Sequence, residues 1–426
     1  METPLTRNIR ADGEPYGLKE YEKRDGYRAL KKAIADYKPE EITNLVKDST
    51  LMGRGGAGFL TGLKWSFVPM GPDAPHPKYF VVNADEMEPG TFKDRVLMEG
   101  DPNQLIEGIV ICSYAVQADI AYIFLRADYD LAERRLAKAI SEAYAAGYLG
   151  KNILGSGYSL ELYIHTSAGR YICGEETALL NSLEGKRAIP RAKPPFPQLS
   201  GLFGMPTVVD NVETVCNVPH IVANGVQWYR SLSKTEIGGT KIYGVSGRVK
   251  NPGWWELPMG TPMRELLEIH AGGMLPGYAF RGALPGGAST DFMVSQHLDT
   301  PLDFASVPKA GSRMGTGTMI VLDDKTCPVA FVLNLLTFFA HESCGWCTPC
   351  REGLPWAARI VRAIERGEGE EGDLAILEEQ TRGLAPGRTF CALAPGAVEP
   401  LQSALKYFRE DFESHVRVKR CPWREP

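Results

Sequence analysis

The segment Lys78-Tyr79-Phe80-Val81-Val82-Asn83 decides the fold that we expect for this chain. A short apolar run rich in aromatic and β-branched residues predicts a buried strand. Apolar residues at helical spacing follow over 103–118, and a second apolar run over 121–126 predicts another strand. Residues 131–146 form an amphipathic helical pattern, and 160–166 is a third strand-like run. This β-α-β-α-β order predicts a parallel sheet with right-handed crossovers, and therefore a Rossmann-like α/β domain.

Acidic loops follow two of these strands. Asp85, Glu86 and Glu88 come after the first strand, and Glu175 and Glu176 come after the third. Ligands of parallel sheets bind outside the carboxyl ends of the strands, where carboxylates accept hydrogen bonds from ribose and repel a 2′-phosphate. A solvated acidic loop is the alternative for any single residue. Two such loops at one sheet edge favour a shared nucleotide site that prefers NAD to NADP.

A glycine-dense stretch, Gly53-Arg54-Gly55-Gly56-Ala57-Gly58-Phe59, precedes the first strand. Its exposed N–H groups could approach a phosphate or a flat ring closely, with positive charge nearby on Arg54 and Lys64. A helical segment ending near Ser49 precedes it, however, and the usual dinucleotide fingerprint follows a strand. From the chemistry alone, a nucleotide cradle and a purely structural glycine turn are equally open. Downstream, Asn83, Asn211 and Thr214 offer uncharged partners for a flavin or its phosphate.

The second motif is Cys344-Gly345-Trp346-Cys347-Thr348-Pro349-Cys350, followed by a distant Cys391. Three thiolates at this spacing can face one centre, and a fourth from elsewhere completes a tetrahedral shell for a 4Fe-4S cluster or a zinc ion. Structural zinc usually takes two separated C-x2-C pairs, whereas C-x2-C-x2-C with a remote cysteine is typical of iron–sulfur proteins. A disulfide knot is the third alternative. The pattern favours iron–sulfur ligation.

Composition limits the classes of function. A length of 426 residues predicts two to four domains, and a net charge of −5 without a basic run excludes a nucleic-acid partner. The longest apolar run, 329–340, is interrupted by Asn334 and is too short to span a bilayer. Any association with a membrane is therefore expected to pass through partner subunits. Cysteines that are mostly scattered singly suit a reducing compartment, so the cytoplasm is expected.

The second half of the chain predicts two further domains. Two short β runs flank the Asn251-Pro252-Gly253 turn, a helix is expected from Thr261 to Gly273, and 318–323 is a strand. This order suggests a small ubiquitin-like β-grasp domain. Helical patterns at 329–341, 356–366, 373–384 and 397–412 predict a C-terminal bundle around the cysteines. The expected divisions are 1–70 (helical arm and glycine loop), 71–238 (Rossmann-like domain), 239–326 (β-grasp domain) and 327–426 (bundle).

Taken together, the glycine stretch, 83–90, 169–176, 211–214 and Cys344–Cys350 form a specific set in a characteristic order. The chain resembles the FMN- and NADH-binding F-type subunits of respiratory complex I, NADH:quinone oxidoreductase, over nearly its whole length. The diaphorase subunits of NAD-linked hydrogenases and formate dehydrogenases are similar and give an alternative function. A second alternative is a non-enzymatic, zinc-stapled assembly subunit, which would be colourless.

The resemblance assigns roles by position. Residues expected around FMN are Gly53, Arg54, Gly55, Gly56, Gly58, Lys64, Asn83, Asp85, Tyr171, Gly174, Glu175, Asn211 and Thr214. Adenine would stack on Phe59, Phe67 and Phe196, with Lys193 close by, while Glu88 and Glu176 would contact the ribose or carboxamide of NADH. Glu86 and Asp210 complete the expected cofactor-binding set, and Cys344, Cys347, Cys350 and Cys391 are the expected cluster ligands. Two departures from the family pattern stand out: Asp210, where a second asparagine is common, and Leu60, where proline or a small residue is usual.

The resemblance also implies a mechanism and partners. NADH gives up a hydride, a flavin can accept it and release electrons singly, and a 4Fe-4S cluster accepts one electron at a time. No general acid or base is required for the hydride step, so no catalytic side chain is expected. The implied partners are a small 2Fe-2S (E-type) subunit and a large iron–sulfur (G-type) subunit. The complex would lie peripherally at the inner face of a bacterial plasma membrane, with this subunit in the cytoplasm.

Overall fold

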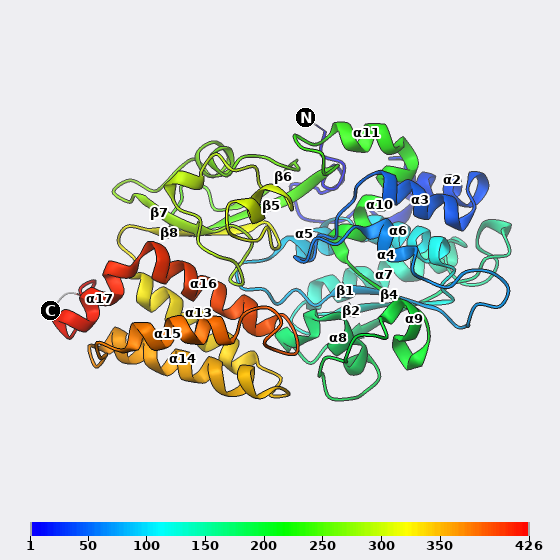
Figure 1. The fold of residues 1–426 in the computed structure, drawn as a ribbon. Helices are drawn as coiled ribbons and strands as arrows, with labels where there is room; N and C mark the ends of the chain where they lie inside the picture. Colours follow the sequence, from blue (N-terminus) through cyan, green and yellow to red (C-terminus); the bar gives the residue numbers. More distant parts are fainter. Residues whose placement is uncertain (1, 425–426) are drawn as a thin grey trace. The chain divides into compact units, whose positions relative to one another are not determined.

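A computed structural model describes residues 2–424 of the chain (Figure 1). The chain divides into two compact units. The first contains the described residues through Met87 together with Phe92–Ile242 and Glu256–Gly260. The second contains Glu88–Thr91, Tyr243–Trp255 and the described residues from Thr261 onward.

The first unit is built on a four-stranded sheet of order β3-β2-β1-β4. The predicted strands are present as β1 (Tyr79–Ala84), β2 (Ile120–Leu125) and β3 (Glu161–Thr166), and all strand pairs are parallel. The two predicted crossover helices are α6 (Pro102–Val116) and α7 (Asp130–Ala145). The expected parallel α/β sheet is thus confirmed. Because β1 lies inside the sheet and is buried on both faces, its sequence reads as a continuous apolar run.

The fourth strand, β4 (Thr207–Asn211), was not predicted. Asp210 and Asn211 end this strand, and α10 (Val212–Asn224) begins directly after them with Asn211 as its cap. β4 pairs with β1 in parallel, from Tyr79 opposite Thr207 to Asn83 opposite Asn211. Only the pairing with β1 distinguishes this five-residue run from a loop entering a helix.

Side chains cap two of the longer helices of the first unit. Asp101 caps α6, where its side chain accepts a hydrogen bond from the amide of Gln104. Asn211 caps α10 in the same way through the amide of Glu213. The remaining elements are α1 (Leu18–Glu22), α2 (Arg28–Asp36), α3 (Pro39–Asp48), α4 (Thr61–Trp65), α5 (Lys93–Gly100), α8 (Glu176–Leu183), α9 (Pro197–Ser200) and α11 (Val226–Ser231).

Most of a mixed sheet of order β6-β5-β8-β7 belongs to the second unit, whereas the first residues of β5 and the last residues of β6 belong to the first unit. The strands of this sheet are β5 (Thr240–Ser246), β6 (Gly253–Pro258), β7 (Phe280–Leu284) and β8 (Thr318–Asp323), and a short helix α12 (Ser306–Lys309) precedes β8. β8 pairs in parallel with β5 and antiparallel with β7. β7 was not predicted. The helix expected from Thr261 to Gly273 is confined to Glu265–His270, where the amide of Ala271 reaches the carbonyl of Leu266 in a wide turn.

Five helices form the C-terminal part of the second unit: α13 (Pro328–Glu342), α14 (Thr348–Arg366), α15 (Asp373–Gly383), α16 (Leu393–Tyr407) and α17 (Arg409–Val418). In Figure 1, α13 to α16 lie side by side as a bundle. α14 begins earlier than the predicted start at Trp356 because Pro349 suits the first helical turn and Pro355 is accommodated inside the helix. The helix expected over 397–412 breaks at Phe408, which leaves the helical region of backbone space. Among residues 2–424, no helix has both the length and the hydropathy needed to cross a membrane.

Candidate nucleotide site and cysteine centre

The carboxyl edge of the first sheet brings together polar residues from three segments. Asn83 lies at the end of β1, and its side-chain amide donates to the carbonyl of Gly174 at 3.1 Å. Asp85 follows β1 and accepts a hydrogen bond from the Ser167 hydroxyl at 2.7 Å, just beyond β3. Asn211 ends the neighbouring strand β4. Parallel pairing therefore places these residues at one edge. The sequence predicted this for the loops after β1 and β3, whereas the position of Asn211 depends on the unpredicted strand β4.

The glycine loop is fixed against the same edge. The amide of Arg54 donates to the Thr214 hydroxyl at 2.8 Å in the first turn of α10. A Cβ added to Gly55 would come within 3.2 Å of the Asn211 Cβ, so glycine permits this close approach. Gly56 has a φ of 120°, which side-chain-bearing residues rarely adopt. The loop is therefore shaped to lie on the start of α10, where helix amides favour negative charge.

The two cations expected beside the loop are engaged within the protein. The Arg54 guanidinium is fully buried and donates to the carbonyls of Gly238 and Thr240 at 3.1 and 3.3 Å. Lys64 forms an ion pair with Asp210 and donates to the carbonyl of Val209 at 2.6 Å. Both residues place positive charge near the loop, as expected, and in each case the charged group is held by other groups of the protein.

Asp210, one of the departures from the family pattern, is also buried and bound to protein groups. Besides Lys64, its carboxylate accepts a hydrogen bond from the Trp65 indole at 2.7 Å. Both partners belong to α4, which directly follows the glycine loop. The acid thus ties α4 to the end of β4, and through α4 it fixes the exit of the loop.

A set of charges lies beneath this edge that the sequence did not reveal: Lys93, Asp94, Glu213 and Lys241, which we call the buried ion network. Each side chain is at most 4% exposed. Lys93 contacts Asp94 at 2.6 Å and Glu213 at 3.0 Å, and Lys241 contacts Glu213 at 2.9 Å. Asn211 joins the network to the edge because its amide donates to Asp94 at 2.6 Å. No local signal marks these residues, since they come from three separate segments.

The network shifts the pKa values of its members. Burial alone would raise the pKa of Glu213, but the cations Lys241, Lys93 and Arg54 outweigh it and hold the pKa at about 2. Burial lowers the pKa of Lys241 to about 8 although Glu213 opposes this shift. The network therefore carries two buried cations and two acids whose charges depend on each other.

Glu86 is buried, as are Asp85 and Asp210 among the predicted acids. Its carboxylate accepts hydrogen bonds from the amide of Asp94 at 2.9 Å and from the Tyr129 hydroxyl at 2.9 Å. Burial, with a smaller contribution from the charge of Asp94, raises the pKa of Glu86 to about 7. The position of Glu86 makes it a support for the loop after β1.

Glu175, Glu176, Lys193 and Phe196 form an accessible group that we call the accessible rim. Lys193 contacts Glu175 at 3.2 Å and Glu176 at 2.6 Å, and these three side chains are 22–29% exposed. Glu175 also caps α8, where it accepts hydrogen bonds from the amides of Thr177 and Ala178. Phe196 is 52% exposed. Carboxylates, an ammonium group and an aromatic face are therefore available to a ligand here.

These features fit a flat, polar nucleotide. Phe59 and Phe67 are about half exposed, like Phe196, although large aromatic side chains usually bury most of their surface. A Cβ added to Gly174 would meet no atom within 4 Å, so open space lies beside the turn Tyr171–Gly174. Open space and backbone amides occur at the sheet edge, and the same unit carries these three exposed rings. This combination suits stacking and phosphate binding.

Glu88 is the one predicted nucleotide-site residue that belongs to the second unit. Its carboxylate accepts a hydrogen bond from the amide of Ser289 at 2.6 Å. A Cβ on Gly287 would approach the Glu88 side chain to 2.6 Å, so glycine is needed beside it. Within its own unit, Glu88 therefore anchors the 88–91 loop.

The predicted cysteine centre lies at the junction of α13 and α14. Cys344 and Cys347 are partly exposed in the connecting loop, and Cys350 is buried in the first turn of α14. The Ser343 hydroxyl lies 3.2 Å from the Cys350 sulfur, and the Arg351 guanidinium donates to the carbonyl of Gly345 at 3.0 Å. Burial, and to a smaller extent the neighbouring thiols, raise the pKa of Cys350 to about 11. A thiol in such surroundings becomes a thiolate readily only when a metal compensates its charge.

Cys391 comes from the loop between α15 and α16. Beside it, the ring of Phe390 packs edge-on against that of Trp346, with centroids 6.3 Å apart. This contact brings the Cys391 loop to the loop that holds Cys344 and Cys347. Three thiols in one loop and helix turn, with a fourth from a loop in contact with them, fit a cluster with four thiolate ligands.

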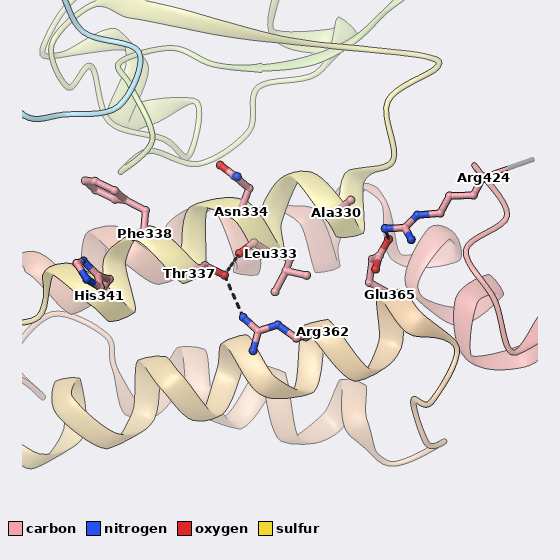
Figure 2. Close-up of a pocket in the computed structure, with 9 residues that line it drawn as sticks. All are labelled: Ala330, Leu333, Asn334, Thr337, Phe338, His341, Arg362, Glu365 and Arg424. Carbon is pink, nitrogen blue, oxygen red and sulfur yellow. Dashed lines mark hydrogen bonds and ion pairs between the residues drawn. The ribbon is translucent and has the colours of Figure 1, made fainter.

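A hollow of about 670 Å³ lies elsewhere on the bundle, between α13, α14 and the C-terminal segment (Figure 2). Its lining includes Asn334, Phe338, His341 and Arg362. None of the predicted nucleotide or cluster residues lines it. The hollow is therefore separate from both sites.

Three family models match successive parts of the chain. The Nuo51 FMN-binding domain family matches residues 46–220, the SLBB domain family matches 242–292, and the NADH-ubiquinone oxidoreductase-F iron-sulfur binding region matches 330–415. An NAD+-reducing NiFe-hydrogenase in its H2-reduced state has a similar structure, with a TM-score of 0.82 and 34% identity, over 96% of this chain and 67% of that chain.

Full-length relatives are more similar in sequence. The F subunit of the NADH-quinone oxidoreductase of Escherichia coli (strain K12) is 58% identical over 97% of this chain and 93% of the relative. The F 2 subunit of the NADH-quinone oxidoreductase of Rhizobium meliloti (strain 1021) is 52% identical over 99% of this chain and 100% of the relative. The chain therefore belongs to the family of NADH-quinone oxidoreductase F subunits.

Proposed function

We propose that this chain is the NADH-oxidising subunit of an NADH:quinone oxidoreductase. The observation that carries the proposal is the meeting of the glycine loop with Asn83, Asp85 and Asn211 at the carboxyl edge of a parallel sheet. Family membership makes the chain an oxidoreductase subunit that uses FMN, a 4Fe-4S cluster and NADH. The alternative of a non-enzymatic zinc-stapled protein does not account for the nucleotide edge.

We assign different residues to the binding of FMN and of NADH. We assign FMN to the glycine loop, Asn83, Asp85, Gly174, Asn211 and Thr214. The loop amides and the start of α10 would hold the phosphate, because helix amides stabilise negative charge. Bound here, FMN would supply the exchange between a two-electron hydride donor and a one-electron acceptor. No side chain of this edge is required as a proton donor or acceptor in that transfer.

The accessible rim is assigned to NADH. Phe59, Phe67 and Phe196 offer faces for the adenine ring, and Glu176 accepts hydrogen bonds from ribose. Lys193 holds Glu176 at 2.6 Å, so its position sets the orientation of that carboxylate. A 2′-phosphate would meet the negative charges of Glu175 and Glu176, which favours NADH over NADPH.

Electrons would leave through the cysteine centre, where Cys344, Cys347, Cys350 and Cys391 hold the cluster. Thiolates are the ligands that such clusters require, and hydrogen bonds to sulfur tune their potential. We predict that Cys391→Ser lowers the iron content and removes the low-temperature EPR signal of the cluster. Cys216→Ser, which alters a buried cysteine of the first unit, should retain both. A Cys391→Ser protein with normal iron and EPR would remove Cys391 from the ligand set.

We also propose a more specific description of the fold than a parallel α/β sheet followed by a mixed sheet and a helical bundle. We describe the first sheet as Rossmann-like and the second as a β-grasp domain, with domain divisions at 70/71, 238/239 and 326/327. The partners are inferred to be a small 2Fe-2S (E-type) and a large iron–sulfur (G-type) subunit. The assembly would lie peripherally at the cytoplasmic face of a bacterial plasma membrane.

The decisive experiment is a visible spectrum of the purified protein with flavin and metal analysis. We expect a yellow-brown protein with bound FMN and iron that reduces ferricyanide with NADH. A colourless protein containing zinc and no flavin would contradict the proposal. The similar fold of an NAD+-reducing hydrogenase supports one second candidate, a hydrogenase-type diaphorase. Copurification with a hydrogenase subunit, and NAD+ reduction driven by H2, would favour that candidate.

A further inference from the structure

A second set of metal-ligand side chains lies in the second unit, apart from the four predicted cluster cysteines. Cys327, His415 and Cys421 are all buried, and their ligand atoms lie within 4.8 Å of one another. Cys327 precedes α13, His415 is in the last turns of α17, and Cys421 follows α17. Cys327 and His415 are 88 residues apart in the sequence. Two distant segments therefore meet at one point.

The imidazole of His415 is oriented for ligation. Its Nδ1 lies 2.6 Å from the carbonyl oxygen of Asp411 and must carry the proton, since a carbonyl can only accept. Nε2 then presents its lone pair to the Cys327 sulfur, 3.4 Å away. A backbone carbonyl that fixes the tautomer in this way is the usual second contact of a metal-binding histidine.

The spacing also suits a metal. With bonds of about 2.3 Å to sulfur and 2.05 Å to nitrogen at a tetrahedral angle, zinc separates the two ligand atoms by about 3.6 Å. The observed 3.4 Å is close to this value. The alternative is a metal-free thiol that donates to the imidazole at the same distance, and it differs from the metal site in containing no zinc.

Charge and ligand softness identify the class of ion. Two thiolates and one divalent cation form a neutral group, which a buried site tolerates far better than free thiolates. Thiolate and imidazole together suit zinc and exclude magnesium or calcium, which take oxygen ligands. We propose that Cys327, His415 and Cys421 bind a zinc-class divalent cation, with solvent as the fourth ligand.

The hollow in Figure 2 lies next to this site. Ala330 lines the hollow, and its amide donates to the Cys327 sulfur at 3.4 Å. Arg424 lines it from the other side, and its amide donates to the carbonyl of Cys421 at 3.3 Å. Two residues that line the hollow therefore form hydrogen bonds with Cys327 and Cys421, which places the hollow beside the site. Figure 2 shows Arg424 reaching Glu365 of α14, an ion pair of 2.5 Å that holds the C-terminal segment in place.

The metal would act as a staple. Cys327 marks the start of the helical bundle, whereas His415 and Cys421 flank the end of its last helix. A bound ion would join these two ends of the bundle without involving the cluster ligands. The site is therefore a structural one, and its loss should loosen α17 before it affects the cluster.

The test is metal analysis of the flavin- and iron-loaded protein, purified without added zinc in the buffers and passed through a chelator. We expect one zinc ion per chain beyond the cluster iron. His415→Ala and Cys421→Ala should each lose it while keeping iron and FMN. Cys112→Ala, which changes an equally buried cysteine in the first unit, should retain it.

Measurements on the unaltered protein keep the proposal testable if these variants fail to fold. Cobalt(II) added after removal of zinc should give sulfur-to-cobalt charge-transfer bands and the strong visible bands of a tetrahedral site. Absence of zinc together with failure to take up cobalt would overturn the proposal. So would a Cys327–Cys421 disulfide, detected by peptide mass in protein purified without reductant. Zinc retained in both His415→Ala and Cys421→Ala would also place the ion elsewhere.

Discussion

The buried ion network and the accessible rim use the same kinds of side chain for different purposes. In the network, Lys93 and Lys241 share the carboxylate of Glu213, and every side chain is at most 4% exposed. In the rim, Lys193 is shared by Glu175 and Glu176, which are 22–26% exposed. Buried charges interact strongly and cannot lose a partner cheaply, whereas exposed pairs are screened and contribute little. The network therefore fixes the sheet edge, and the rim is free to exchange partners with a ligand.

The largest effect is expected from Glu213→Gln. Removing this charge leaves Lys93 and Lys241 buried with too few acids, which should lower the free energy of unfolding by about 3–5 kcal/mol. Denaturant unfolding of the protein measures the change. As a control, Asp128→Asn breaks the surface pair with Arg126 and should change stability by no more than about 0.5 kcal/mol. Equal effects of the two substitutions would remove the distinction between network and surface pairs.

The lowered pKa of Glu213 predicts that the protein loses stability at acidic pH. The folded-state pKa of Glu213 is about 2, below its ordinary value of 4.5. Its stabilising contribution is therefore complete above about pH 4.5 and is lost as the pH falls towards about 2. The stability difference between the unaltered protein and Glu213→Gln should narrow over that range. Unfolding curves at several acidic pH values check this, and a constant difference would contradict the depressed pKa.

The raised pKa of Glu86 predicts a dependence of stability on pH that has the opposite sign. Its pKa is raised to about 7 in the folded protein, so the folded state binds its proton more tightly than the unfolded state. Its contribution is present below about pH 4.5 and is lost as the pH rises through about 7. Glu86→Gln resembles the protonated form and should flatten the decline in stability between pH 5 and 8, by on the order of 1–3 kcal/mol. An unchanged slope in urea unfolding would show that Glu86 does not titrate there.

The smallest effect on stability is expected from the rim. Glu176→Gln removes one of the two negative charges that a 2′-phosphate would meet, so the ratio of kcat/KM for NADPH to that for NADH should rise by about fivefold to tenfold. Unfolding should change little, because the Lys193–Glu176 pair is partly exposed. Glu133→Gln on α7 serves as the control, because it also removes one negative charge but lies outside the accessible rim. Unchanged NADPH oxidation in Glu176→Gln would remove this residue from ribose recognition.

The sequence alone determined the parts of the protein that depend on local patterns. The continuous apolar run of β1 and the alternating strand and helix patterns after it are enough to predict a parallel sheet. Parallel strands bring their carboxyl ends together, so the order of the strands is enough to assign Asn83, Asp85 and Glu175 to one edge. Four cysteines with the spacing of 344–350 and 391 likewise indicate a metal centre, because ligand spacing along the chain is itself the signal.

Only the tertiary structure decided which charges are buried and which partners they take. Arg54 looks from its loop like a phosphate ligand, but its side chain is enclosed by the carbonyls of Gly238 and Thr240. β4 becomes a strand because β1 offers it a pairing edge. Lys93, Glu213 and Lys241 meet from three segments, and Cys327 meets His415 and Cys421 from the other end of the bundle. Such contacts have no sequence period or spacing, because they arise from packing between elements that are distant along the chain.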